Sequence, residues 1–244
     1  MTTAPPKLYT ELAGWWQLVS PTADYAEEAA FLGELFHDVP ATPARTLLEL
    51  GAGGGNNAFH LKADFELVLT DLSPEMLALS ERQNPELEHQ PGDMRSLRLG
   101  RRFDGVLIHD AIDYMLREDD LRAAFVTAGE HLRPGGIVVV APDCTAETFV
   151  AQTRHEGVDG EGRALRYLEW VWDADPDDTR YNYDLVLALR EGDDLRTVVD
   201  RHECGLFATR VWLAALEHAG FAARAVDDPS SEGERAQVFV GLKR

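Results

Sequence analysis

Cysteine is scarce in this chain of 244 residues, which has only two, and they lie far apart. Neither Cys144 nor Cys204 belongs to a CxxC pair. This spacing argues against a disulfide framework and against a zinc site, and it is typical of proteins from a reducing compartment. We therefore expect two buried thiols and no metal.

Basic residues are also few, because 23 Lys and Arg stand against 43 Asp and Glu and give a formal net charge of -20. Proteins that bind DNA or RNA gather Lys and Arg against the phosphates, and this chain would repel a polyanion. We expect no nucleic-acid partner. The acidic excess is spread along the chain, which is typical of a well-solvated surface.

Long hydrophobic runs are absent as well, since no apolar stretch reaches the roughly 20 residues that span a bilayer. The N-terminus has no basic segment followed by an apolar one, as a secretory signal would. We expect no membrane association and a cytoplasmic location. Hydrophobic residues make up 45% of the chain, which is enough for one sizeable core.

The order of hydrophobic patterns divides the chain. Apolar residues recur at three and four in "LYTELAGWWQLVSP" and "DYAEEAAFLGELFHDV", which predicts two N-terminal helices. From residue 46 short apolar runs alternate with helical segments, which predicts an α/β fold with a parallel sheet buried on both faces. Ser73 and Pro74 are expected to begin one helix, and Gly135 with Gly136 to end another.

After residue 150 the pattern changes to period two. "RALRYLEWVWDAD", "TRYNYDLVLALRE" and "LRTVVDRHECGLF" are joined by turn residues, which predicts an antiparallel meander. "ATRVWLAALEHAGF" then predicts a helix and "RAQVFVGLKR" a last strand. The expected parts are an N-terminal helical part at 1–40, the ligand-binding core at 41–150, the β insert at 151–206, and a helix and strand at 207–244 that complete the core.

The stretch "LLELGAGGGNNAFHL" places Glu49 near a strand end, ahead of Gly51, Gly53 and Gly55. A phosphate-binding P-loop continues with Lys and Ser or Thr, but this loop continues with two asparagines. The dinucleotide fingerprint GxGxxG needs a glycine where Asn56 stands, which weakens that interpretation without excluding it. A cationic ligand without phosphate fits better, and S-adenosyl-L-methionine (SAM) is such a ligand.

Three acidic residues at successive strand ends suit the parts of SAM. Glu49 could hold the ammonium, while the bare glycines let the methionyl and ribose groups approach the backbone. Asp71, after "FELVLT", could accept from both ribose hydroxyls, although the same spacing suits NAD. Asp93 could accept from the adenine amino group while Met94 packs near the ring. Taken singly, Asp71 and Asp93 also fit ordinary turn formers.

"LELGAGGG", "TDLSPEML", "GDMRSL", "FDGVLIH" and "HLRPGGIVVV" resemble, in order and spacing, the class I SAM-dependent methyltransferases over roughly residues 45 to 142. The β insert, "GDMR" and "HLRPGG" resemble the branch with the N,N-dimethyltransferases of nucleotide-linked aminosugars. The resemblance implies a Rossmann-like, doubly wound, mostly parallel seven-stranded sheet and a meander that shapes the acceptor site. It places these residues around SAM, the first of them on an N-terminal lid: Tyr9, Gly51, Ala52, Gly53, Asp71, Leu72, Met76, Asp93, Met94 and His109.

One segment departs from that branch, because "HDAIDY" stands where small hydroxyl residues are usual. His109, Asp110 and Asp113 follow the fourth strand and are the candidate bases, and Tyr114 matches the tyrosine of the branch. As alternatives, His109 packs over the adenosine, Asp110 or Asp113 caps a helix, and Tyr114 belongs to the core. Aligning the reactants is worth roughly 7–11 kcal/mol and a general base roughly 3–5 kcal/mol, so a missing base would not abolish catalysis.

Aromatic residues are frequent in the segments expected to cover the site, and they predict either an acceptor pocket or packing between strands and subunits. The candidate acceptor residues are Trp15, Trp16, Tyr114, Trp170, Tyr183 and His202. We therefore expect methyl transfer from SAM to a nitrogen or oxygen of a small molecule, and a homodimer is left open. The alternatives are an NAD(P)-binding oxidoreductase with a degenerate fingerprint and a non-catalytic partner protein with the same fold.

Overall fold

A seven-stranded sheet forms the core of the protein in this computed structural model, which describes residues 5–229 and 237–244. The strand order is β10-β11-β5-β4-β1-β2-β3. All neighbours are parallel except β11, which runs antiparallel between β5 and β10. The strands are β1 (Thr46–Leu50), β2 (Glu66–Asp71), β3 (Glu88–Pro91), β4 (Phe103–Ile108), β5 (Leu132–Val140), β10 (Phe221–Asp227) and β11 (Gln237–Lys243). The doubly wound, mostly parallel sheet is confirmed; the first two residues of the expected last strand lie outside the described residues.

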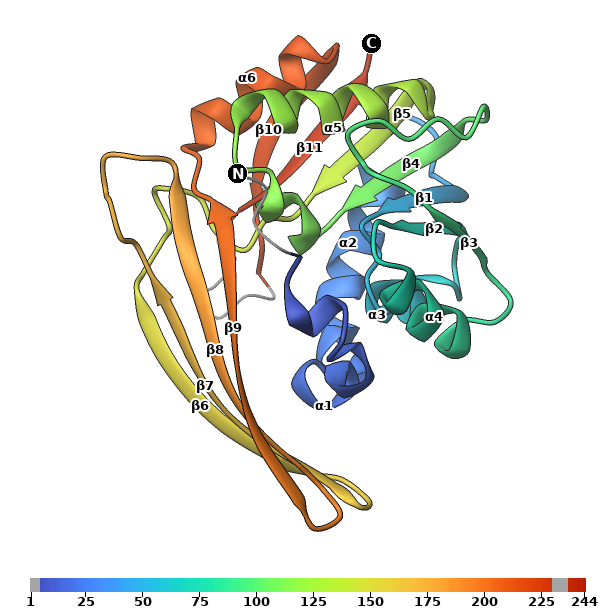
Figure 1. Cartoon of the computed structure of the whole chain (residues 1–244). Coiled ribbons are helices and arrows are strands. Elements are labelled where there is room, and N and C mark those ends of the chain that lie inside the picture. The colour runs from blue at the N-terminus through green and yellow to red at the C-terminus, as the bar shows by residue number, and fades with distance from the viewer. Residues whose placement is uncertain (1–4, 230–236) are drawn as a thin grey trace.

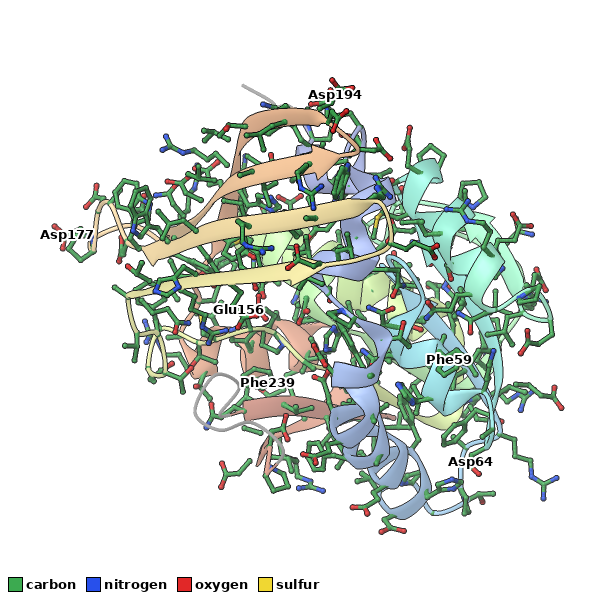
Figure 2. All side chains as sticks on the ribbon, turned by 90° about the horizontal axis from the view of Figure 1, so that it is seen from below. Phe59, Asp64, Glu156, Asp177, Asp194 and Phe239 are labelled. Atoms are coloured by element: carbon green, nitrogen blue, oxygen red, sulfur yellow. The ribbon has the colours of Figure 1, made fainter. Side chains whose placement is uncertain are left out.

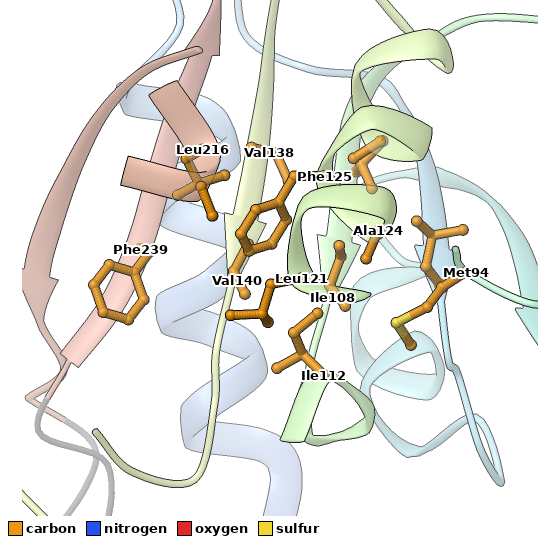
Figure 3. Packing of buried hydrophobic residues seen from close by; sticks show 14 of the residues in the cluster. Met94, Ile108, Ile112, Leu121, Ala124, Phe125, Val138, Val140, Leu216 and Phe239 are labelled. Atoms are coloured by element: carbon orange, nitrogen blue, oxygen red, sulfur yellow. The ribbon is translucent and has the colours of Figure 1, made fainter. Parts of the chain in front are cut away.

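Helices cover both faces of this sheet, because parallel strands with apolar side chains on both sides need both faces buried. α5 and α6 pack on one face, where Phe125 and Leu216 meet Val138 and Val140 (Figure 3). α2 and α3 pack on the other face. The longer helices are α2 (Ala26–Asp38), α4 (Pro74–Gln83), α5 (Glu118–Glu130) and α6 (Thr209–His218), and α3 (Asn56–Leu61) is short. No helix in the described part of the chain combines the length and apolar character that crossing a bilayer requires.

The predicted start of α4 is confirmed, but the predicted end of α5 is wrong. Ser73 accepts a hydrogen bond from the Met76 amide at 3.1 Å, with Pro74 in the first turn. α5 ends at Glu130, before the two glycines, which lie within β5. The His131 ring explains the early end, since one ring nitrogen bonds the Thr127 carbonyl at 2.8 Å and the other bonds the Leu99 amide at 2.9 Å.

The insert is an antiparallel sheet of four strands, not the three expected from the pattern. The strands are β6 (Gln152–Asp159), β7 (Arg163–Trp172), β8 (Arg180–Glu191) and β9 (Asp194–Gly205). β6 lies at the edge, and its mostly exposed side chains give no hydrophobic alternation. Figure 2 shows the layer of this sheet from below, with Glu156 on β6 and Asp194 at the β8–β9 turn. Both cysteines are free thiols; Cys204 is buried, whereas Cys144 is only partly buried.

The N-terminal segment, residues 5–25, lies between the insert and the core (Figure 1). Its first predicted helix is wrong: the backbone forms short turns at Lys7–Tyr9, Ala13–Trp15 and Thr22–Tyr25, with one helical turn, α1 (Trp16–Val19). Side chains of the insert bind backbone groups of this segment, among them the Gly14 carbonyl, which a helix would use internally and which accepts from Arg163 Nη1 at 3.0 Å. Both oxygens of Asp200 accept bonds from the Lys7 and Leu8 amides, at 2.9 and 2.7 Å.

Candidate active site

The carboxyl ends of β1 and β4 meet at the switch point of the sheet. These strands are neighbours, but the chain continues from β1 to β2 and β3 on one side and from β4 to β5 on the other. Open α/β sheets bind ligands at such a point. The loops after β1, β2, β3 and β4 therefore lie along one edge, and all the predicted cofactor residues except Tyr9 and Met76 belong to these strand ends and loops.

The glycine loop after β1 requires glycine for two reasons. Gly51 and Gly53 have φ of 79° and 53°, in the left-handed region where a side chain is strained. In addition, a Cβ on Gly51 would lie 2.3 Å from Ala111 Cβ and 2.9 Å from Met94 Cε. The Gly51 and Ala52 amides both donate to the Thr70 carbonyl, at 2.8 and 2.9 Å. The bare loop thus packs against the segments that follow β3 and β4.

Asp71, the last residue of β2, ties this loop to the start of α4. One carboxylate oxygen accepts from the Gly53 amide at 2.8 Å and the other from the Ser73 amide at 2.8 Å. Burial raises the pKa of Asp71, and these backbone bonds oppose the rise. A carboxylate has about four acceptor sites, so two backbone bonds leave capacity for ribose hydroxyls. Leu72, which follows, is 69% exposed, and Met76 packs 3.6 Å from the place of a Cβ on Gly53.

Glu49 is the observation that tests the fit of SAM. Glu49 is only 2% exposed, and its Oε2 has no hydrogen-bond partner among the described residues. Burial raises its pKa to about 8, with Asp71 adding to the rise and His109 opposing it. Buried polar atoms without a partner are rare in proteins. An ammonium is a suitable partner, so the residues at this edge fit SAM.

Asp93 is already paired within the chain. The Arg95 guanidinium binds it, with the shortest contact at 2.6 Å, and holds the pKa of Asp93 below its ordinary value. The sequence pattern did not single out Arg95. Met94 is buried beside Gly51, as expected for a residue near the adenine. The contact of Asp93 with the adenine amino group stays a prediction, and Arg95 would orient the carboxylate for it.

Trp16 covers the glycine loop. A Cβ on Gly54 would lie 2.6 Å from the indole Nε1 of Trp16, and that buried nitrogen has no partner in the described part of the chain. Two hollows of about 360 and 590 Å³ lie elsewhere, one at β10 and β11 and one on the face of the insert that carries Trp170. The N-terminal lid stays a prediction, in which Trp16 lies over the part of the loop that the methionyl end of SAM is expected to approach.

We expect SAM and its product S-adenosylhomocysteine (SAH) to displace Trp16. Titration of the protein with SAH should change the tryptophan fluorescence, because the indole exchanges its contact with Gly54 for a contact with ligand or solvent. Trp16→Phe should lose most of that change, whereas Trp172→Phe, on the exposed face of the insert, should retain it. An equal change in wild type and Trp16→Phe would show that Trp16 does not respond to the ligand.

His109 lies between two carboxylates. Its Nε2 is 2.7 Å from Glu28 Oε1 on α2, and its Nδ1 is 3.2 Å from Asp110 Oδ2. Burial alone would lower the pKa of His109, but Asp110 more than offsets this and the pKa rises to about 9. The ring therefore carries a positive charge at neutral pH. Its role as a general base is a prediction that this geometry does not favour.

Two further carboxyl groups, those of Asp113 and Asp143, interact with His109 through charge. Asp113 is 2% exposed; its Oδ2 accepts from the Asp143 amide at 2.8 Å, and its Oδ1 has no partner within the described residues. Burial raises the pKa of both Asp113 and Asp143, and Asp110 raises them further. Asp143 was not predicted, although it follows the run "GIVVVAP", and the rule of acidic residues at strand ends could have found it.

Tyr114 connects the core to the insert. Its hydroxyl donates to the Tyr9 hydroxyl at 3.0 Å and lies 2.5 Å from His202 Nδ1. The other ring nitrogen of His202 is 3.1 Å from Asp200 Oδ2. The structure thus brings together three predicted residues, and adds Asp200, which no sequence signal distinguished.

The predicted aromatic pocket is only partly assembled. Tyr183 faces the core side of the insert, packs edge-on against His202 at 5.1 Å and donates to Glu169 at 3.1 Å. Trp170 pairs with Asp184 and lies on the opposite face, 44% exposed, so the structure does not bring it to the site. Trp15 is buried in the apolar contact between the N-terminal segment and the insert, with the Arg163 guanidinium over its ring.

An open, mostly parallel sheet with this glycine loop and these acidic strand ends defines the class of SAM-dependent methyltransferases. The model of a methyltransferase domain matches residues 47–136. The chain is 32% identical, over 225 residues, to the dTDP-3-amino-3,4,6-trideoxy-alpha-D-glucopyranose N,N-dimethyltransferase of Streptomyces venezuelae, and covers 91% of it, with 90% of this chain covered.

Solved structures agree with this result. Streptomyces venezuelae DesVI superposes with a TM-score of 0.85 at 27% identity, covering 96% of this chain and 98% of that one. The sugar N-methyltransferase KedS8 from Streptoalloteichus sp. has a TM-score of 0.85 at 25% identity, covering 100% of this chain and 96% of that one. The chain belongs to the SAM-dependent methyltransferases, in the branch that contains the aminosugar N,N-dimethyltransferases. It is an enzyme that transfers methyl groups to a small molecule, and the oxidoreductase and partner-protein alternatives are wrong.

Proposed function

We propose that this enzyme methylates the amino group of a nucleotide-linked deoxyaminosugar. The observation that carries the proposal is the 32% identity to an aminosugar N,N-dimethyltransferase over nine tenths of both chains. A second relative, 35% identical over 61% of this chain, is the dTDP-3-amino-3,6-dideoxy-alpha-D-glucopyranose N,N-dimethyltransferase of Streptomyces fradiae. The acidic groups of the site, buried Asp113 and neighbouring Asp143, support an amine, since they favour a cationic or hydrogen-donating acceptor.

In this proposal each cofactor-binding residue contacts a different part of SAM. Glu49 holds the ammonium, Gly51 and Gly53 lie against the methionyl and ribose groups, Asp71 accepts from the ribose, and Asp93 from the adenine. When bound, SAM supplies a methyl group on a positively charged sulfur. The chain supplies alignment of the acceptor nitrogen with that methyl group, which is the largest contribution available to such a reaction.

The N-terminal segment supplies the second part of the mechanism. Tyr9 lies beside Trp16, with ring centroids 5.7 Å apart, and its carbonyl accepts from Ser73 Oγ at 2.6 Å. The closed segment therefore bridges the insert and the start of α4 above the glycine loop. Closure excludes water and fixes the acceptor between Tyr9, Tyr114 and the loop.

The departure at "HDAIDY" affects the acceptor more than the cofactor. His109, Asp110 and Asp113 form one cluster, in which His109 and Asp113 are buried and Asp110 is partly exposed. We propose that this cluster favours a sugar with a polar or basic substituent near the amine. A cytoplasmic location, a homodimer and the absence of nucleic-acid partners stay predictions.

The test is methyl transfer from methyl-labelled SAM to dTDP-3-amino-3,6-dideoxy-α-D-glucopyranose, with mass spectrometry of the product. We expect mass gains of one and then two methyl groups. The same sugar with a hydroxyl in place of the amine is the control and should gain none. Methylation of the hydroxyl sugar, or no methylation of any dTDP-aminosugar by protein that binds SAH, would contradict the proposal.

A further inference from the structure

Four side chains near the site have no part in aligning the acceptor with the methyl group. Asp200, His202, Tyr114 and Tyr9 form a continuous hydrogen-bonded chain from the insert to the edge of the glycine loop. We propose that this chain is a proton relay, in which His202, held by Asp200, accepts the proton that the acceptor nitrogen loses, by way of Tyr114 and Tyr9. This inference rests on the proposed function, because it needs an amine acceptor.

The inner end of the relay is a buried imidazole fixed by a carboxylate. The His202 side chain is 0% exposed and that of Asp200 is 4% exposed. Asp200 also accepts the Lys7 and Leu8 amides, and the bond to His202 together with these bonds lowers the pKa of Asp200 against the effect of burial. An ionised carboxylate fixed on Nε2 leaves Nδ1 directed at Tyr114, the arrangement that orients a histidine base in acid–base catalysis.

The outer end of the relay lies beside the segments that are expected to hold the cofactor. Tyr9 contacts Trp16, which covers Gly54, and its backbone bonds Ser73 beside Asp71. Asp110 and Asp143, at the carboxyl ends of β4 and β5, lie close enough to raise the pKa of Tyr9 further. Tyr9 belongs to the N-terminal segment, so the relay is complete only when that segment is closed. Closure of the N-terminal segment therefore also completes the hydrogen-bonded path to His202.

The proton transfer balances without another reactant. The acceptor nitrogen forms the new N–C bond as the C–S bond breaks, and the sulfur keeps that electron pair. Tyr114, which donates to Tyr9 in the free protein, first turns its hydroxyl hydrogen toward His202 Nδ1. The resulting ammonium then gives a proton to the Tyr9 oxygen, Tyr9 passes its own proton to Tyr114, and Tyr114 passes its proton to His202 Nδ1. Each hydroxyl both donates and accepts, so both tyrosines end neutral. The imidazolium lies on Asp200, and opening of the segment releases the proton to water.

Such a relay matters most for the second methyl group. A nitrogen that has received one methyl group carries a positive charge and has no free electron pair until it loses a proton. Enclosed beneath the segment, it has no bulk water to take that proton. The relay takes that proton before SAH leaves, so the amine is free when a second SAM has replaced SAH.

The groups that face His202 come from four elements. Tyr9 and Tyr114 lie on the N-terminal segment and after β4, Tyr183 on β8, and Asp200 on β9. Asp184 on β8 also interacts with His202 through charge. Only the two carboxylates are ionised at neutral pH among these groups, because burial raises the pKa of all three tyrosines.

The test removes the His202 imidazole by substitution and supplies a small base in solution in its place. His202→Ala is assayed with methyl-labelled SAM and dTDP-3-amino-3,6-dideoxy-α-D-glucopyranose, alone and with added imidazole or pyrazole, which have nearly the same shape but differ greatly in basicity. We expect kcat to fall about 100-fold, with the KM for the sugar and the SAH affinity by calorimetry each changing less than about threefold. Imidazole should restore at least a tenth of the rate, and pyrazole should not. His155→Ala, an exposed histidine on β6, is the control and should match wild type.

The outcomes separate the relay from the proposed function. An active wild type with an unchanged kcat in His202→Ala, or equal rescue by imidazole and pyrazole, would overturn the relay and leave the proposed function standing. A loss that appears only in KM or in SAH affinity would also overturn it, since it would assign His202 to structure. A wild type that binds SAH but methylates no dTDP-aminosugar would overturn the proposed function, and the relay with it.

Discussion

Asp71→Ala should abolish SAH binding, with a loss of affinity of more than about 100-fold. The carboxylate is expected to accept from the ribose, and it also holds the Gly53 and Ser73 amides at 2.8 Å each. Without it the glycine loop and the first turn of α4 lose their common anchor. Leaving backbone donors without a partner should also lower the free energy of unfolding by about 1–3 kcal/mol. Calorimetry with SAH and thermal unfolding of the free protein measure the two effects.

Two variants control this experiment. Asp71→Asn keeps one acceptor oxygen for the two amides and should retain part of the stability while binding SAH weakly. Asp64→Ala removes an exposed aspartate from the turn before β2 and should change neither quantity. Full SAH affinity in Asp71→Ala would contradict the assignment of this carboxylate to the ribose.

Glu49→Gln should stabilise the free protein at alkaline pH and weaken SAH binding. The folded protein holds the Glu49 proton up to about pH 8, whereas the unfolded chain releases it near 4.5. Because the folded pKa lies above the unfolded one, the unfolded state binds fewer protons in this interval, and stability falls as pH rises from about 4.5 to 8. The shift corresponds to roughly 3–5 kcal/mol. Glu49→Gln should lose this part of the pH dependence in denaturant unfolding.

Binding of SAH should change the protonation of Glu49. The ammonium of SAH stabilises the charged carboxylate, so binding at pH 7 should release a proton from Glu49, seen as a calorimetric enthalpy that depends on the buffer. Glu49→Gln should release none and bind SAH roughly 10–100-fold more weakly. Methylthioadenosine, which lacks the amino acid part, should bind both proteins alike. Equal SAH affinity in both proteins would contradict the role of Glu49.

The sequence predicts the core of the site well because its signals are local. Glu49, Gly51 and Asp71 stand at strand ends that can be read from hydrophobic runs, and the topology of a parallel sheet then brings strand ends to one edge. The left-handed φ of Gly51 and Gly53 is the reason that the loop is so rich in glycine.

The acceptor side is less predictable because it depends on contacts between distant segments. Asp200 differs in no local pattern from neighbouring acids of the insert, and its role follows only from meeting His202 and the N-terminal amides. The face of Trp170 depends on the register of β7 with β8, and a spacing of two does not say which face is inner. The first N-terminal helix fails for a similar reason, since Arg163 of the insert binds the Gly14 carbonyl, which lies inside the expected helix.

Titration of the wild-type protein with SAM and with SAH tests the central claim most directly. The glycine loop, the unpartnered oxygen of Glu49 and the carboxylate of Asp71 predict one binding site per chain for each ligand, with micromolar affinity or better, and no comparable heat with NAD or NADP. Absence of binding by both SAM and SAH at high micromolar concentration would contradict the account.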